Sequence, residues 1–261
     1  MLRNAIGSDN LAITPKCDLL FSRLGAFLLT IGMVIAFFIS QLLGVYVAGK
    51  LVLPSTKNDT VANIFFFGSN DGTVVSLSII IGCVLLVAVS VLIIRLRGGS
   101  VRQYLALKLP SWSVSMKLLG LLLVFMVASQ VLTYFLGETP LEFVDPLYQS
   151  VSSVWLLVFA MVIVAPLYEE LVFRGILWSA IAEQFEASSI KHYGAIVASI
   201  ITSLIFAVIH VQYGIYEIST IVVLALLFCY ARVRSGSLLL PMLLHIVNNG
   251  VAMGQYLIQT A

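Results

Sequence analysis

Long apolar stretches separated by short polar segments make up most of the chain. A helix needs about 20 predominantly apolar residues to cross a bilayer. Seven stretches reach or approach this length: residues 24–48, 74–94, 115–136, 151–172, 194–211, 215–231 and 237–258. Residues 175–185 are also apolar, and they form either an eighth helix or a continuation of the fourth stretch. The pattern predicts an all-α fold, a polytopic membrane helix bundle of about seven to eight transmembrane helices.

The composition supports a membrane protein and excludes some classes of partner. Of the 261 residues, 61% are hydrophobic and 10% are charged, whereas a soluble domain has about 45–50% apolar and about 25% charged residues. The excess apolar surface must face a lipid bilayer. The net charge of +2 and the lack of a basic stripe indicate no nucleic-acid partner. No internal repeat divides the chain, so residues 1–261 are expected to form a single membrane domain, whose oligomeric state the sequence does not indicate.

The basic residues predict the orientation in the membrane. With seven spans and a cytoplasmic N-terminus, Lys50 and Lys57 are the only Lys or Arg residues outside the cytoplasmic segments. Residues 137–150 form a predicted external loop, which carries acidic but no basic residues. Cytoplasmic loops of membrane proteins are enriched in Lys and Arg. We therefore expect a multi-pass protein of the cell membrane with its N-terminus in the cytoplasm. Its size and the lack of a targeting segment suit a bacterial cytoplasmic membrane.

One charged segment interrupts the apolar sequence, Pro166-Leu-Tyr-Glu169-Glu170-Leu-Val-Phe-Arg174-Gly175. Charges inside a bilayer are costly, and they persist when they are paired or functional. Glu170 and Arg174 are four residues apart, with the Glu first, so they can pair on one helix face. Glu169 points about 100° away from Glu170 on an ideal helix. It lacks this local partner and is therefore the candidate for chemistry.

Two of the three histidines lie in apolar helices. His210 ends the fifth stretch, and His245 shares a helix face with Asn249 in the seventh. A single His in such a helix is usually a hydrogen-bonded core residue, but two of them with an acidic pair and an Asn indicate a site. The rise of about 1.5 Å per residue puts Glu169 and His210 at one depth if residues 186–192 form a turn. His245 lies near the start of its stretch and fits that depth less well.

Three motifs stand in order on separate predicted helices: Glu169-Glu170-Leu-Val-Phe-Arg174, Phe206-Ala-Val-Ile-His210 and His245-Ile-Val-Asn-Asn249. Together they resemble the pattern of the CPBP family of intramembrane proteases, also called the CAAX-protease and bacteriocin-processing or Abi family. The resemblance covers residues 165–250, which would form a CPBP-like catalytic core within the single domain. The first three stretches carry no motif of the family.

The resemblance implies an intramembrane endopeptidase. Such an enzyme would use a Glu-activated water to hydrolyse a peptide bond of a membrane-associated or lipidated protein or peptide, its partner at the membrane. The catalytic residues would be Glu169, His210, His245 and Asn249, and the supporting or substrate-positioning residues would be Glu170 and Arg174.

The roles implied for these residues leave the cofactor open. Glu169 would be the general base, and His210 would hold and polarise the water. His245 and Asn249 would donate hydrogen bonds to the oxyanion. The family has been described both as a metalloprotease and as a metal-independent glutamate protease. Asn249 suits an oxyanion donor better than a zinc ligand, so no cofactor is favoured; the alternative is zinc held by Glu169, His210 and His245.

Two other classes of function account for the same residues. A proton-coupled secondary transporter often has intramembrane Glu, His and Arg in its proton relay, and Pro166 would break a helix at its binding site. The hydrophobic pattern shows no repeat, however, and the chain is short for two halves. A non-catalytic membrane immunity or scaffold protein would keep the motif residues for structure alone. Peptide cleavage by the purified protein separates the protease from both.

Overall fold

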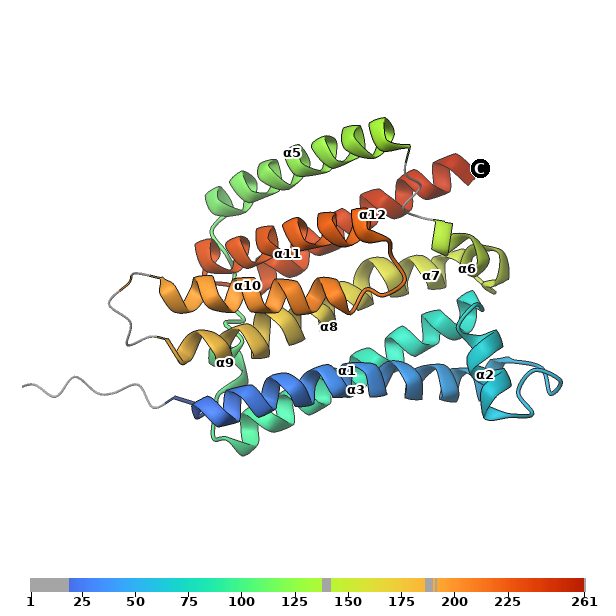
Figure 1. Cartoon of the computed structure of the whole chain (residues 1–261), viewed down its shortest axis with the longest axis horizontal. Helices are drawn as coiled ribbons and strands as arrows, with labels where there is room; N and C mark the ends of the chain where they lie inside the picture. Colours follow the sequence, from blue (N-terminus) through green and yellow to red (C-terminus); the bar gives the residue numbers. More distant parts are fainter. Residues whose placement is uncertain (1–18, 138–141, 186–189, 191, 261) are drawn as a thin grey trace, which may run out of the picture.

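The computed structural model describes residues 19–137, 142–185, 190 and 192–260 (Figure 1). Every regular element in these ranges is a helix, and the long helices run back and forth along the long axis of the molecule (Figure 1). The predicted all-α membrane bundle is confirmed. The elements are α1 (Arg23–Val52), α2 (Val61–Gly68), α3 (Gly72–Leu96), α4 (Val101–Tyr104), α5 (Trp112–Leu136), η1 (Glu142–Val144), α6 (Asp145–Ser150), α7 (Val154–Val158), η2 (Phe159–Val164), α8 (Ala165–Glu170), η3 (Leu171–Leu177), α9 (Trp178–Glu183), α10 (Tyr193–Val208), α11 (Ile215–Ser235) and α12 (Leu239–Thr260).

Five helices of the described residues are long and apolar enough to cross a membrane: Arg23–Val52, Gly72–Leu96, Trp112–Leu136, Val154–Glu183 and Ile215–Ser235. The other two predicted spans correspond to α10 and α12. The apolar helix α10 has only 16 residues. Helix α12 has 22 residues, but polar side chains such as His245, Asn248 and Asn249 interrupt its apolar sequence. Both helices lie along the same axis as the other five (Figure 1).

The fourth predicted span is part of one helix of 30 residues, Val154–Glu183. The apolar residues after Gly175 continue this helix and do not form an eighth one. Two π-helical segments, η2 and η3, flank the short α-helical segment α8. Pro166 lies in the first turn of α8, and the helix continues through it. Such π-helical turns are frequent at functional sites.

The helix Val154–Glu183, called here the central helix, lies between two groups of helices (Figure 1). On one side it packs against α1 and α3, and on the other against α10 and α12. Helix α5 is at the outer edge and contacts α11 and α12. Of the apolar stretch of the central helix 61% is buried, against 11% for α5. Any charged side chain in the middle of the central helix is therefore enclosed by protein.

Close packing of α1 on α3 supports one side of the central helix. A Cβ atom on Gly44 of α1 would lie 2.7 Å from the main-chain oxygen of Ser78 in α3, so only glycine allows this approach. Phe37 of α1 then reaches the central helix, where its ring lies 5.9 Å from Tyr168 and 5.8 Å from Phe173.

One end of the bundle is basic. The start of α1, the end of α3, α4, the start of α5 and the end of α11 meet at the left end in Figure 1. These segments contain Arg23, Arg95, Arg97, Arg102, Lys117, Arg232 and Arg234. Lys50 in the last turn of α1 and Lys57 in the segment between α1 and α2 lie at the other end. The separation agrees with the predicted charge asymmetry of the loops; a cytoplasmic location of the basic end stays a prediction.

Candidate active site

The acidic pair lies in the middle of the central helix, at the end of α8. Glu169 is 9% exposed, and Glu170 and Arg174 are fully buried. Nη1 of Arg174 donates a hydrogen bond of 2.9 Å to Oε1 of Glu170, as their spacing predicts. The charge of Glu170 is therefore compensated within its own helix.

Two aromatic rings from other helices hold the guanidinium group of Arg174. Its central carbon lies 4.4 Å from the ring centre of Phe206 in α10 and 5.5 Å from that of Phe228 in α11. Nη2 donates to the main-chain oxygen of Ala225, at 3.2 Å. These contacts fix the cation between three helices, with the cation–π geometry that favours Arg over other cations.

His245 of α12 lies between the two carboxylates. Its Nδ1 is 2.9 Å from Oε1 of Glu170, and its Nε2 is 3.7 Å from Oε2 of Glu169. The imidazole ring is buried and lies 4.9 Å from the ring of Phe228, at an angle of 30°. The first and third motifs, far apart in the sequence, therefore meet at one place.

The turn between α11 and α12 lies inside the bundle and not at its end, which explains why His245 lies at the level of Glu169 and Glu170 along the bundle. Leu238, just before α12, is fully buried, and its N–H donates to the main-chain oxygen of Ala106 at 3.1 Å. Its side chain is so close to Gly175 that a Cβ atom there would lie 3.2 Å from it. Helix α12 thus starts at the level of Gly175, five residues after Glu170 and eight before the end of the central helix at Glu183. The expectation of a poor depth match for His245 assumed that the turn lay at the end of the bundle, and it is wrong.

His210 follows α10 and is half-buried. Its Nδ1 lies 2.6 Å from the main-chain oxygen of Phe206, so Nδ1 carries a proton and Nε2 is left as the acceptor. The ring of Phe206 lies 4.6 Å from that of His210 and 6.0 Å from that of His245. Among the contacts of the described residues, none joins His210 directly to either carboxylate. Phe206 is the residue that connects the two imidazole rings.

Asn249, one turn after His245, binds the backbone of the central helix. Its Nδ2 donates to the main-chain oxygen of Met161 in η2, at 3.1 Å. Its Oδ1 accepts a hydrogen bond of 3.3 Å from Nδ2 of Asn248. Both ends of the amide are therefore held by protein groups.

Residues 151–251 match the family model described as Rce1-like, type II CAAX prenyl endopeptidase Rce1-like. This segment belongs to the CPBP/CAAX protease family. It contains all six residues of the candidate site and runs from just before the central helix into α12. Helices α1 to α5 lie outside it.

A curated relative of the Rce1-like segment is a protein of Escherichia coli described as an uncharacterized 24.3 kDa protein. It is 35% identical over 98 residues, which are 37% of this chain and 42% of the relative. The match therefore covers less than half of either protein. No solved structure matches the chain.

The candidate zinc ligands of the Rce1-like segment do not form a ligand set. Among the described residues, no three His, Cys, Asp or Glu side chains are grouped in a way that could hold a metal ion. Nδ1 of His245 is engaged with Glu170, and Nδ1 of His210 with the backbone. These bonds leave both Nε2 atoms available, as in many zinc ligands, so the mismatch with zinc rests on the grouping of the side chains, which does not bring Glu169, His210 and His245 together.

Other residues of the site were not identified from the sequence. Gln41 of α1 donates to the hydroxyl group of the buried Tyr168, at 2.9 Å, next to Glu169. Tyr213, after α10, has its ring 6.1 Å from His210 and 5.0 Å from Phe143. The polar Gln41 inside an apolar stretch is a signal that could have been noticed. Tyr213 lies in a loop and gave none.

Tyr213 is a neutral hydrogen-bond donor beside the Rce1-like site. Burial raises the pKa of its phenol, and the carboxylates of Glu169 and Glu217 raise it further. The hydroxyl group therefore keeps its proton at neutral pH. Tyr213 and the neighbouring His210 are both half-buried, so the hydroxyl group of Tyr213 lies on the more exposed side of the site.

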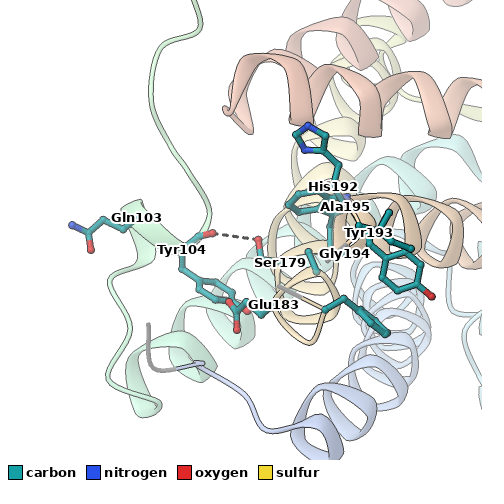
Figure 2. A pocket seen from close by; sticks show the side chains of 12 residues that line it. Gln103, Tyr104, Ser179, Glu183, His192, Tyr193, Gly194 and Ala195 are labelled. Atoms are coloured by element: carbon teal, nitrogen blue, oxygen red, sulfur yellow. Dashed lines mark hydrogen bonds between the residues drawn. The ribbon is translucent and has the colours of Figure 1, made fainter. Parts of the chain in front are cut away.

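One cavity lies at a different place. It has a volume of about 530 Å³ and is lined by residues of α4, the end of α9 and the start of α10 (Figure 2). Ser179 donates across it to the main-chain oxygen of Tyr104, at 3.4 Å (Figure 2). Glu183, in its wall, lies about 20 Å along the central helix from Glu169 at about 1.5 Å per residue. The cavity is therefore separate from the candidate active site.

Proposed function

We propose that the chain is an intramembrane endopeptidase, in which Glu169 activates a water molecule to hydrolyse a peptide bond of a membrane-associated or lipidated protein or peptide. The observation that carries the proposal is the pairing within the buried network. Among the described residues, Glu170 binds both Arg174 and His245, whereas Glu169 pairs with His245 alone, at 3.7 Å. Glu169 is thus the carboxylate that is free to accept a proton.

The charges of the buried network of Glu169, Glu170, Arg174 and His245 support a proton that is shared between Glu169 and His245. Two carboxylates and one guanidinium leave one negative charge uncompensated, and buried charge is costly without compensation. One proton on Glu169 or His245 makes the network neutral. When the proton is on His245, Glu169 is an anion and acts as a general base toward water. The proton taken from water then replaces one that His245 donates to the reacting group.

Glu170 orients His245 for this exchange. The hydrogen bond at Nδ1 fixes the tautomer and directs Nε2 toward Glu169. The Nε2–Oε2 distance of 3.7 Å is longer than a hydrogen bond, so a water molecule beside the two atoms can bind both. In the protonated state Nε2–H is a donor to the oxyanion of the tetrahedral intermediate.

His210 is proposed to hold and polarise the attacking water on the more open side of the site. Its Nε2 is an acceptor, because Nδ1 is bonded to the backbone. In this mechanism every proton transfer uses side chains of the chain itself. The partners are a protein or peptide substrate and the lipid bilayer, and the basic end of the bundle faces the cytoplasm.

The full chain, reconstituted in lipid vesicles, is the material for the test. A fluorogenic peptide with a farnesylated C-terminal Cys-a-a-X sequence and its unprenylated form are the first probes, because the matched family is described as prenyl endopeptidases. Wild type should cleave a probe, Glu169→Gln should not, and the exposed loop variant Asp59→Asn should cleave it normally. Glu→Gln keeps the shape but removes the base, so the rate should fall by at least about 10²–10⁴.

Proteomics of membranes from cells with wild type or Glu169→Gln extends the test to other substrates. An uncleaved membrane protein that accumulates with the variant supports the proposal and identifies the substrate. Cleavage by Glu169→Gln at the wild-type rate would overturn it. An inactive wild type together with unchanged membrane proteomes would overturn it in favour of a transporter or scaffold.

A further inference from the structure

A second buried cation lies near the basic end of the bundle. Arg232, in the last turn of α11, is 6% exposed. Its Nε donates to the main-chain oxygen of Arg174 in the central helix, at 3.3 Å, and its central carbon lies 5.3 Å from the ring centre of Trp178. These contacts hold the guanidinium group between α11 and the central helix.

The two terminal nitrogens of Arg232 have no hydrogen-bond acceptor among the described residues. The ion pairs of these residues all involve Glu169 or Glu170, so Arg232 has no carboxylate partner there. A buried charge without an opposite charge is costly. The terminal nitrogens are not among the fully buried side-chain atoms that lack a partner, so they lie at the accessible edge of the side chain. The fork of N–H donors is therefore open to a ligand.

Lys108 adds a second positive charge beside the end of α11. A Cβ atom on Gly236, the C-terminal cap of this helix, would lie 3.2 Å from Nζ of Lys108. Gly236 follows Arg232 by four residues, which is about one helical turn. Lys108 is exposed, and it also lacks a carboxylate partner among the described residues. Two neighbouring cations without an acid favour an anionic ligand, and the planar fork of Arg matches a phosphate or a carboxylate.

The depth of Arg232 favours a lipid phosphate over the carboxylate of a peptide at the active site. The central helix has 30 residues, so it is about 45 Å long and extends about 7.5 Å beyond each side of a centred hydrocarbon core of about 30 Å. Trp178 precedes the end of this helix at Glu183 by five residues, or about 7.5 Å. The guanidinium group on Trp178 therefore lies where the hydrocarbon core meets the headgroups. Glu169 lies about 13 Å deeper along the same helix.

We propose that Arg232 and Lys108 bind the phosphate group of an anionic phospholipid at the basic end of the bundle. Basic pockets between transmembrane helices are known to bind such headgroups. The bound phosphate compensates the charge of Arg232 and so fastens the end of α11 to the central helix beside Arg174. The site does not depend on the proposed protease activity.

Lipid binding by the full chain, purified in a neutral detergent, tests the site. Native mass spectrometry with phosphatidylglycerol and phosphatidylcholine of the same acyl chains gives the Kd of each lipid. Wild type should bind phosphatidylglycerol more tightly than phosphatidylcholine. Arg232→Gln should weaken phosphatidylglycerol binding by about 10–10², the effect of losing hydrogen bonds to a charged group. Arg232→Lys keeps the charge but loses the fork, so its affinity should lie between the two.

Arg102→Gln is the matched control, because it removes one positive charge from an exposed residue of α4 at the same end. It should weaken phosphatidylglycerol binding by no more than about fivefold, the contribution of one exposed cation near a membrane surface. The difference between wild type and Arg232→Gln should persist in about 0.5 M salt, since buried pairs are screened little. Lys108→Gln, an exposed change, should weaken binding more than Arg102→Gln does, and it tests the site even if Arg232→Gln does not fold.

Thermal unfolding in the same detergent separates the sources of the anion. Phosphatidylglycerol should raise the Tm of wild type more than phosphatidylcholine does, and Arg232→Gln should lose most of this difference. Equal stabilisation by inorganic phosphate would overturn the lipid as the source. Equal phosphatidylglycerol affinity of wild type, Arg232→Gln and Lys108→Gln would overturn the site itself.

A kinetic outcome would assign Arg232 to the substrate instead. If Arg232→Gln raises the KM of a peptide with a free C-terminal carboxylate, but not that of its C-terminal amide, and lipid binding is unchanged, the proposal is overturned. An inactive wild type would contradict the protease assignment alone, because the lipid measurements do not use cleavage.

Discussion

Nδ1 of His245 lies 2.9 Å from Oε1 of Glu170, and the same oxygen accepts the hydrogen bond from Arg174. Glu170 thus connects the acidic motif of the central helix to the histidine motif of α12. Glu169 binds neither Arg174 nor the Nδ1 atom and faces Nε2. Two adjacent carboxylates therefore have different environments, and this difference is the basis of the different roles proposed for them.

The orienting role of Glu170 predicts a partial loss of activity in Glu170→Gln. The amide oxygen can still accept from Nδ1, but the negative charge that stabilises a protonated His245 is removed. We expect the cleavage rate to fall by about 10–10², the usual effect of changing an orienting partner, and therefore less than in Glu169→Gln. Steady-state kinetics in vesicles measures the two rates. Equal losses in both variants would contradict the distinct roles.

The buried ion pair predicts a strong effect of Arg174 on stability. Arg174→Met leaves the carboxylate of Glu170 buried without its cation, which should cost about 3–5 kcal/mol. The double variant Arg174→Met with Glu170→Leu removes both charges and should recover a large part of this loss. Thermal unfolding in detergent compares the three proteins. A single variant as stable as wild type would show that the pair does not hold the helices together.

The charge asymmetry of the two ends predicts the orientation of the bundle. Single cysteines at the exposed positions Lys57 and Arg234, in a chain without its native cysteines, report the two ends. In intact cells a membrane-impermeant maleimide should label Lys57→Cys. It should label Arg234→Cys only after the cells are permeabilised. Labelling of both positions in intact cells would contradict the predicted topology, and the opposite pattern would reverse it.

The arrangement of the side chains predicts activity without a metal ion, because Glu169, His210 and His245 are not grouped as ligands. Elemental analysis of active, detergent-purified protein should find no stoichiometric zinc, and chelators should leave the cleavage rate unchanged. His245→Ala should lose activity with no change in metal content. One zinc per chain in wild type that disappears in His245→Ala would show that the side chains rearrange around a metal.

Local sequence was sufficient for the features that depend on near neighbours in the chain. The apolar stretches predicted the membrane bundle, because a bilayer demands long apolar helices. The spacing of Glu170 and Arg174 predicted their contact, since residues four apart meet on a helix. The three motifs identified the helices that carry the site, although nothing in them gave its geometry.

The tertiary structure decided how these helices meet. His245 reaches Glu170 because the turn before α12 is recessed to the level of Gly175, where glycine leaves room for Leu238. The side chain of Asn249 donates to the main-chain oxygen of Met161, because η2 and Pro166 leave that oxygen without a donor from its own helix. Both contacts join residues more than 60 positions apart, and their formation depends on packing and unsatisfied backbone groups that no local pattern encodes.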